Sequence, residues 1–452
     1  MIYRHAAPRG AVLFTLVYLS GSSAAQMVPP SDELLLTGFT SASVDRYDAG
    51  DGTLLGELGP GGLAGVLGAA VGLDGRIYVC SETNDRIVRF DAASGAFVDN
   101  FIIDDPVTPV DESGGLDGPA AILFGRDGFA YVASFNTDSI LRYDGETGAF
   151  DSVFVTTVPG NLNGPDAGMA FGPDGDLYVP SFFSNRVKRY DGVTGAYVGN
   201  LVAPPWADID RPRTVVFPGD GFAYVASEGN DKVLKVDAAT GQAVVEELIA
   251  DDPGTPQDET GGLNGPTGLA FGPDGLIYVA SLHTSSVLRY ETDGTFVDEF
   301  VPSGLGGVQL PTFLAFRPAA LNICSVAANS TGRPARIGAQ GFTSIGADDF
   351  TLTATSTPPG VSGLFFYGDR SISVPFGDGI RCVGGPIFRL RVTQASDVGW
   401  ASHALDFANP PRPAGQIQAG STWYFQFWYR DPAGPLASGF NTSDSLEVVF
   451  GG

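Results

Sequence analysis

The chain has 452 residues, of which 43% are hydrophobic, 62 are glycine and 32 are proline. It carries 25 Lys+Arg against 51 Asp+Glu, so its formal net charge is −26 at pH 7. The apolar content is enough for large cores, which excludes a disordered chain, and the length allows one large and one smaller domain. Phosphate groups repel so acidic a chain, so we expect neither a nucleic-acid partner nor binding to an anionic membrane.

Residues 1–25 have the pattern of a secretory signal peptide. Arg4 and Arg9 precede an apolar run over 11–19, which is too short to span a bilayer. Small residues before Gln26 offer a cleavage site. No later stretch is long and apolar enough for a transmembrane helix. We therefore predict an exported chain, located outside the cell, at its surface or in the periplasm.

A repeated unit follows the leader. It is typified by GPDGLIYVASLHTSSVLRYETDGTFVDEF from Gly272. The tyrosines that mark it are 53, 47, 46 and 54 residues apart: Tyr78, Tyr131, Tyr178, Tyr224 and Tyr278. Each unit has four apolar runs of strand length separated by Asp-Gly or Gly-rich turns. This pattern is typical of a propeller blade.

The two ends of the repeat predict a closed ring. The segment from Leu34 matches strands two to four of a blade, and LPTFLAFRP from Leu310 matches a first strand. Together they would complete a sixth blade and leave no open sheet edge. We predict an all-β chain with a six-bladed β-propeller over 26–318, closed by three strands plus one, and a separate domain over 319–452.

The pattern DG-x-x-YVAS…RYD…TGAF resembles NHL-type repeats and the related streptogramin-lyase-like six-bladed propellers. The resemblance covers about two-thirds of the chain and implies the fold without implying one activity, because such propellers include lyases, lactonases, sensors and binding scaffolds. Streptogramin-lyase-like sites use more than one histidine with an acid and a metal. Here His283 is the only histidine within 26–318, and the metal cluster of gluconolactonase-like relatives cannot be matched.

Strand-like runs continue beyond 319 without the repeat, for example DFTLTATS, IFRLRV and TWYFQFWYRD, and predict a small antiparallel β-sandwich. CSVAANSTG and GSTWYFQFWYRDPAG resemble a C-terminal β-domain of exported proteins from planctomycete-type bacteria, which implies no activity. Cys324 and Cys382 are the sensible disulfide pair in an exported domain, with two buried thiols as the alternative. In the strand around Trp423 one aromatic face should be core, while the other either packs too or stacks on sugars.

Two near-identical loops, DDPVTPVDESGGLDGP (104–119) and DDPGTPQDETGGLNGP (251–266), concentrate carboxylates. Crowded hard oxygen ligands on a loop suit Ca²⁺. The alternatives are solvated loops shaped by proline and glycine, or a docking surface for a basic partner. The candidate calcium ligands are Asp104, Asp105, Asp111, Glu112, Asp251, Asp252, Asp258 and Glu259.

Aspartates that recur in every unit, such as Asp274 before Gly275, are explained as turn caps. Residues that the repeat does not require are better site candidates. The loops between strands two and three should share one face with the loops that join successive blades. Candidates for acid–base work there are Glu82, Glu228 and His283, and candidates for a ligand-binding face are Asn136, Asp166, Phe183, Arg213 and Thr267.

We interpret the chain as an exported propeller that serves as a scaffold for a protein, small-molecule or carbohydrate ligand, with calcium as its one candidate cofactor and the sandwich as an attachment module. The first alternative is a lyase or lactonase that uses Glu82, Glu228 and His283 around a metal. The second is a structural component of the cell surface.

Overall fold

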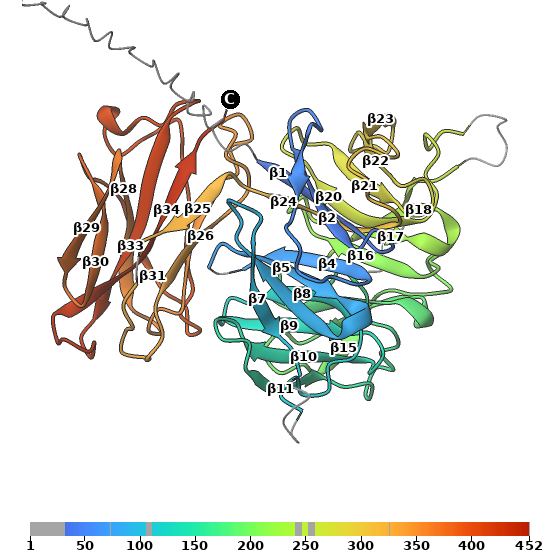
Figure 1. The fold of residues 1–452 in the computed structure, drawn as a ribbon, viewed down its shortest axis with the longest axis horizontal. Helices are drawn as coiled ribbons and strands as arrows, with labels where there is room; N and C mark the ends of the chain where they lie inside the picture. Colours follow the sequence, from blue (N-terminus) through green and yellow to red (C-terminus); the bar gives the residue numbers. More distant parts are fainter. Residues whose placement is uncertain are drawn as a thin grey trace, which may run out of the picture.

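The computed structural model describes residues 32–72, 74–104, 111–239, 246–251, 258–324 and 326–451. It is all-β, with a propeller and a β-sandwich side by side (Figure 1). The predicted signal peptide over 1–25 lies outside the described residues. Among the described residues, no helix has the length and apolar character needed to cross a membrane.

Six four-stranded antiparallel sheets form the propeller within the described residues. Each sheet is given from its first to its fourth strand; the first two sheets are β24 (Pro311–Arg317), β1 (Glu33–Gly38), β2 (Ser43–Asp48) and β3 (Leu54–Glu57), and β4 (Val66–Val71), β5 (Ile77–Ser81), β6 (Arg86–Phe90) and β7 (Phe97–Ile102). The next two are β8 (Pro119–Phe124), β9 (Phe129–Ser134), β10 (Ser139–Asp144) and β11 (Phe150–Val155), and β12 (Ala170–Phe171), β13 (Leu177–Ser181), β14 (Arg186–Tyr190) and β15 (Tyr197–Val202). The last two are β16 (Pro212–Val216), β17 (Phe222–Ser227), β18 (Lys232–Asp237) and β19 (Glu246–Ile249), and β20 (Pro266–Phe271), β21 (Ile277–Ser281), β22 (Ser286–Tyr290) and β23 (Phe296–Val301).

The ring closes between β1 and β24, which pair antiparallel. Glu33 of β1 secures this closure, because its buried carboxylate lies 2.8 Å from Arg317 of β24 and 2.7 Å from Arg46 of β2. The sheet therefore combines three strands from one end of the repeat with one from the other, which confirms the predicted closure.

A tyrosine and an aspartate recur from sheet to sheet. The Asp127 Oδ1 accepts a hydrogen bond from the backbone N–H of Phe129, and its Oδ2 accepts one from the Tyr131 hydroxyl at 2.7 Å. The Tyr131 ring packs edge-on against Phe154 and Phe171 in the core between two sheets. The same Asp–Tyr hydrogen bond recurs in the following three sheets. The predicted turn caps are confirmed, and they also anchor the repeat's tyrosines.

The sandwich consists of two antiparallel sheets and a hairpin (Figure 1). In sheet order they are β25 (Ala320–Ile323), β34 (Gly439–Val449), β33 (Thr422–Asp431), β28 (Ser362–Gly368) and β31 (Phe388–Gln394); β26 (Arg336–Gln340), β27 (Thr351–Thr355) and β32 (Ala401–Ala404); and the hairpin β29 (Arg370–Phe376) and β30 (Gly379–Gly384). Phe365, Phe425 and Phe427 are among its fully buried core residues.

Both faces of β33 are covered. The hairpin lies against the face opposite the core, where the buried Gln426 accepts a hydrogen bond from the Cys382 N–H and donates to the carbonyl of Ile380. Trp428 on that face contacts Phe440, which in turn contacts Phe376. The strand is therefore packed on two sides, which disfavours the alternative of a sugar-stacking surface.

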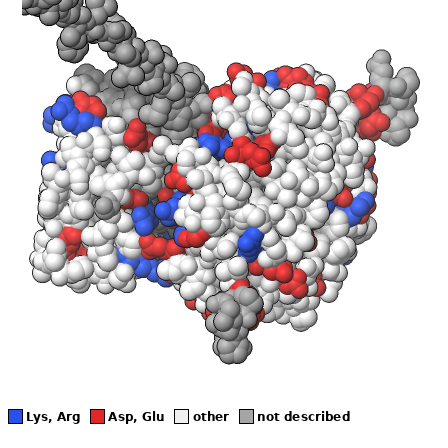
Figure 2. Space-filling model, in the orientation of Figure 1, with Lys and Arg blue, Asp and Glu red and all other residues white. Residues whose placement is uncertain are grey.

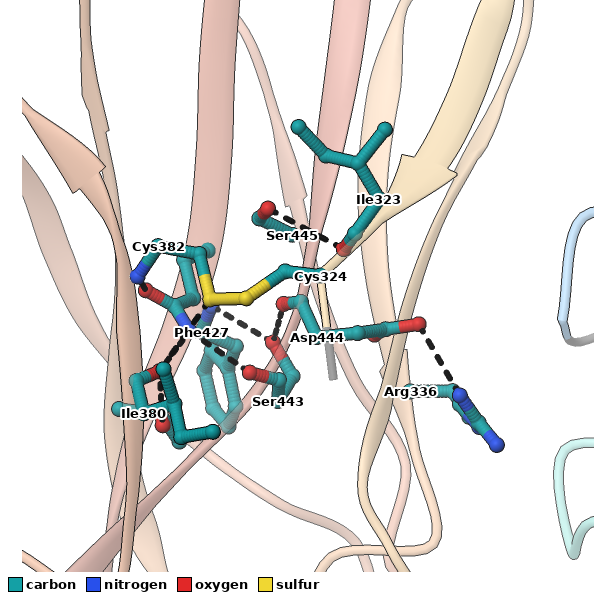
Figure 3. Close-up of a disulfide and its surroundings, with 11 residues drawn as sticks. Ile323, Cys324, Arg336, Ile380, Cys382, Phe427, Ser443, Asp444 and Ser445 are labelled. Carbon is teal, nitrogen blue, oxygen red and sulfur yellow. Dashed lines mark hydrogen bonds and ion pairs between the residues drawn. A yellow bond between two sulfur atoms is a disulfide. The ribbon is translucent and has the colours of Figure 1, made fainter. Parts of the chain in front are cut away.

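Cys324 and Cys382 form the predicted disulfide, which ties the start of the domain to β30 (Figure 3). Asp444 lies beside it, fully buried. Its carboxylate accepts from the Ile337 N–H at 2.8 Å and lies 3.4 Å from Arg336. Burial raises the pKa of Asp444 to about 7, although Arg336 opposes the shift. Cys80 of β5 is a buried free thiol, and burial raises its pKa, as expected for a packed small residue.

Propeller and sandwich are joined by polar contacts. Arg333 forms an ion pair with Asp144, and Arg336 lies 2.8 Å from Glu146. Asp32, which precedes β1, accepts hydrogen bonds from the N–H and the hydroxyl of Thr343. Figure 2 shows basic and acidic side chains gathered along this boundary. The sandwich is therefore docked on the propeller by several specific contacts.

Candidate binding face of the propeller

The loops between second and third strands share a face with the loops that join successive sheets. The Phe135 N–H donates to the Gly118 carbonyl at 2.9 Å, and the equivalent bond joins Phe182 to Gly164. Three of these loops contain a short 3-10 turn, η1 (Glu82–Asn84), η2 (Phe182–Ser184) and η3 (Glu228–Asn230). The sequence prediction of a shared face is therefore confirmed.

An ion network of three predicted residues lies at this face. The Arg213 guanidinium donates to Asp166 at 2.9 Å and to Glu228 at 2.5 Å. Asp166 is 0% exposed and Glu228 is 7% exposed. Two neighbouring sheets thus contribute to one buried cluster, with Asp166 ahead of β12, Arg213 on β16 and Glu228 in η3.

The backbone at the network departs from the repeat. Gly168 donates to the Arg213 carbonyl and accepts from the Val215 N–H, so this segment bonds sideways to β16. A Cβ on Gly168 would lie 2.5 Å from the Cα of Thr214, so only glycine permits the approach. As a result β12 is only two residues long, whereas the repeat predicts a longer first strand.

Burial and opposite charge compete within the network. Burial raises the pKa of Asp166, while the charge of Arg213 opposes that shift. Burial works against the charge of Arg213, but Asp166 and Glu228 together raise its pKa. Removing Arg213 would leave two buried carboxylates without their main partner, a costly state. The network therefore holds two sheets in fixed positions at the face.

Three aromatic rings lie next to the network. Phe183 contacts Phe135 and Phe182, with ring centroids 5.5 and 5.0 Å apart. The Arg213 guanidinium stacks over Phe182 at 4.6 Å from the ring centroid. Phe183 is 60% exposed, so a large apolar ring faces solvent and contacts Phe182, the ring over which Arg213 stacks. Phe135 and Phe182 were not among the predicted site residues. The sequence could have indicated them, because they occupy a position that varies from unit to unit, with Glu82, Glu228 and Leu282 as the equivalent residues.

Glu82 of η1 is half-buried, and the Thr83 hydroxyl donates to its carboxylate at 3.4 Å. Burial raises its pKa, and the nearby charges of Asp85, Asp117 and Asp166 add to the effect. Glu82 therefore lies within electrostatic reach of the network.

The remaining predicted residues are placed differently. His283 is exposed, and its backbone N–H donates to Asn264 of the same sheet's loop. Asn136 is exposed and donates to the Asp117 carboxylate at 2.8 Å. Thr267 is fully buried, and its hydroxyl donates to the Pro311 carbonyl at 2.8 Å. Thr267 thus links β20 to β24 within the ring.

The two acidic loops have the same hydrogen bonds where they are described. The Asp111 Oδ1 accepts from the N–H and hydroxyl of Ser113, and the Asp258 Oδ1 accepts likewise from Thr260. These bonds lower the pKa of both aspartates. Asp104 and Asp251 each accept from the backbone N–H of Glu112 and Glu259, respectively. Asp105 and Asp252 lie outside the described residues.

Within the described parts of the chain, no group of three or more His, Cys, Asp or Glu side chains is arranged to hold a metal ion. The calcium prediction depends on loops that are described only in part. It therefore stays a prediction.

No family model matches the chain, and no curated protein matches it. Similar solved structures include the crystal structure of a nidogen/laminin complex, 15% identical, covering 63% of this chain and 98% of that chain with a TM-score of 0.49. A streptogramin B lyase is 16% identical over 60% of this chain and 84% of its own, with a TM-score of 0.42. Hydrazine synthase of Kuenenia stuttgartiensis is 19% identical over 63% and 90%, with a TM-score of 0.44.

At these scores the similarities carry no argument about activity, ligand or partner. The sheet topology itself establishes the propeller and confirms the predicted fold. The resemblance of the sandwich to a planctomycete-type C-terminal domain stays a prediction.

Proposed function

We propose that the propeller is a binding scaffold and that its ligand contacts the face around Phe183. The observation that carries this proposal is the 60% exposed ring of Phe183, packed on Phe135 and Phe182 beside Arg213. The exposed ring of Phe183 contacts Phe182, over which the Arg213 guanidinium stacks. Such a surface suits a protein segment or a carbohydrate, because both bind through apolar faces and polar edges.

The ion network supports binding over catalysis. The Glu228 carboxylate accepts from Arg213 and also lies 3.3 Å from Arg211, so its oxygens are engaged by two guanidinium groups. A general base needs a carboxylate that is free to take a proton from substrate. The alternative of a lyase or lactonase using Glu82, Glu228 and His283 is therefore less well supported than a preorganised binding surface.

Export and attachment complete the proposal. The disulfide of the sandwich is compatible with an oxidising compartment outside the cytosol. The propeller would then present its ligand-binding face while the sandwich attaches or spaces it. Calcium bound by the twin acidic loops would stiffen two connections at the rim of the same propeller.

A glycan and peptide array probed with the labelled protein tests the binding face. We expect at least one class of ligand to bind the unaltered protein and to lose about tenfold or more in affinity with Phe183→Ala, because a stacked aromatic contact is removed. Phe97→Ala is the matched control, since Phe97 is an exposed phenylalanine on the outer strand β7. Equal losses in both variants would contradict the proposal.

A further inference from the structure

The sandwich contains a cavity of about 360 Å³ at an open seam. It lies where β31, the edge strand of the five-stranded sheet, meets β32, the edge strand of the three-stranded sheet. Arg389, Arg391 and His403 line it from these strands, and Asp406 and Phe407 line it from the loop after β32. The cavity belongs to the sandwich alone and shares no residue with the propeller face.

Hydrogen bonds hold the loop that follows β32, which lines part of the cavity. The Tyr367 hydroxyl donates to the Gly415 carbonyl at 2.8 Å, and the Gln416 side chain donates to the Phe407 carbonyl at 2.8 Å. The Phe407 ring packs against Phe450 of the core. The loop over 405–417 is therefore anchored to the sandwich, and the hollow is a preformed feature of the fold.

The charge of the cavity is unusual for this chain. Most described arginines, such as Arg213 and Arg289, lie in ion pairs. Within the described parts of the chain, no ion pair involves Arg389 or Arg391, and both are exposed on β31. Two arginines thus line the cavity, and neither forms an ion pair within the described residues.

The one carboxylate of the lining is already engaged. Asp406 accepts from the backbone N–H groups of Ala408 and Asn409 and from the Asn409 side chain. The hydrogen bonds from Asn409 are the main cause that lowers the pKa of Asp406, and the charge of Arg391 lowers it further. Burial and the charge of Arg391 lower the pKa of His403, so it is neutral near pH 7 and offers a hydrogen bond without charge. The cavity therefore has a surplus of positive charge.

We propose that this cavity binds a small organic acid through its carboxylate. The guanidinium fork of arginine matches a carboxylate in shape and charge, and two arginines at positions i and i+2 of one strand can share one ligand. The volume lies in the range of ordinary small-molecule sites. Asn409 and His403 in the lining can supply hydrogen bonds for hydroxyl groups, so a hydroxylated acid suits the lining best.

Calorimetric titration of the full chain with glucuronate and with citrate tests the proposal, with glucose as the uncharged probe. We expect at least one of the two acids to bind and glucose not to bind. Arg389→Gln combined with Arg391→Gln should weaken acid binding at least about tenfold, since two charged hydrogen bonds are lost. Ala404→Glu, which adds a negative charge to the lining, should weaken it as well.

Arg370→Gln combined with Arg430→Gln is the matched control, because it removes the same charge from the same domain at arginines outside the cavity. Thermal unfolding of each variant confirms that the sandwich remains folded. Absence of binding by both acids would overturn the proposal. Equal binding by the cavity variant and the control variant would overturn it too.

Discussion

Propeller and sandwich accommodate buried polar groups in different ways. In the propeller the same hydrogen-bonded arrangements recur, such as the bond from Tyr131 to Asp127 and its counterpart from Tyr278 to Asp274. In the sandwich each buried polar group has its own arrangement of hydrogen bonds, as with Asp444 beside the disulfide and Gln426 under the hairpin. Repetition gives a background against which functional departures can be seen, whereas a unique domain gives none.

The largest loss of stability is expected for a variant at the point where the ring closes. Glu33→Ala removes the carboxylate shared by Arg46 and Arg317 and leaves two mostly buried guanidinium groups unpaired. We expect it to lower the free energy of unfolding by about 3–5 kcal/mol, measured by urea denaturation. Glu57→Ala, at an exposed position of β3, is the control. If the free energy of unfolding falls equally in both variants, Glu33 does not secure the ring.

The corresponding test in the sandwich removes its covalent link. Replacing Cys324 and Cys382 by alanine frees a loop with a sequence separation of 58 residues. We expect a loss of about 2–4 kcal/mol, seen as faster proteolysis within the sandwich while the propeller stays resistant. Cys80→Ala is the control and should cost little, because the equivalent residues of other sheets are Ala133, Ala226 and Ala280. Equal proteolysis of both variants would refute a role for the disulfide.

A third test concerns a buried acid that does not follow the repeat. Asp45 of β2 is 1% exposed, and burial raises its pKa to about 6. The folded chain holds this proton up to about pH 6, whereas the unfolded chain releases it near pH 4, so stability falls as the pH rises between these values. We expect Asp45→Asn to be more stable than the unaltered protein by about 1–3 kcal/mol at pH 8 and nearly equal to it at pH 4.

Denaturation at the two pH values measures this effect. Asp51→Asn, at an exposed turn, serves as the control. A benefit that does not depend on pH would contradict the account of Asp45.

The smallest expected effect belongs to the twin acidic loops. If they bind calcium, millimolar Ca²⁺ should raise the unfolding temperature of the propeller by about 2–5 °C relative to chelator, since binding to the native state stabilises it. The combined variant Asp104→Asn, Asp251→Asn should lose the shift. A variant with Asp51→Asn and Asp293→Asn, both at exposed turns, should keep it. No shift in the unaltered protein would leave the loops as solvated turns.

The sequence predicts the propeller well because each sheet repeats a local pattern of strands and turns. It also singles out Asp166 and Arg213, since no other unit has these residues at those positions, and Glu228, whose counterpart in another unit is Glu82. That they form one network could not be predicted, because it depends on a sideways backbone pairing between Gly168 and β16.

The cavity of the sandwich was not predicted for a related reason. Arg389 and His403 come from edge strands of different sheets, and only the packing of those sheets brings them together. In sequence they look like solvated residues of ordinary strands. Thr267 shows the reverse case, since a variable residue that looked available for a ligand instead bonds within the ring.

Hydrogen–deuterium exchange of the full chain with and without the best ligand from the array tests the central claim most directly. The account predicts slower exchange on binding at the loops over 132–138, 180–186 and 226–232, which carry Phe135, Phe183 and Glu228. It predicts no change on the outer strands. Protection confined to the sandwich or to the outer strands, with these loops unchanged, would contradict the assignment of the binding face.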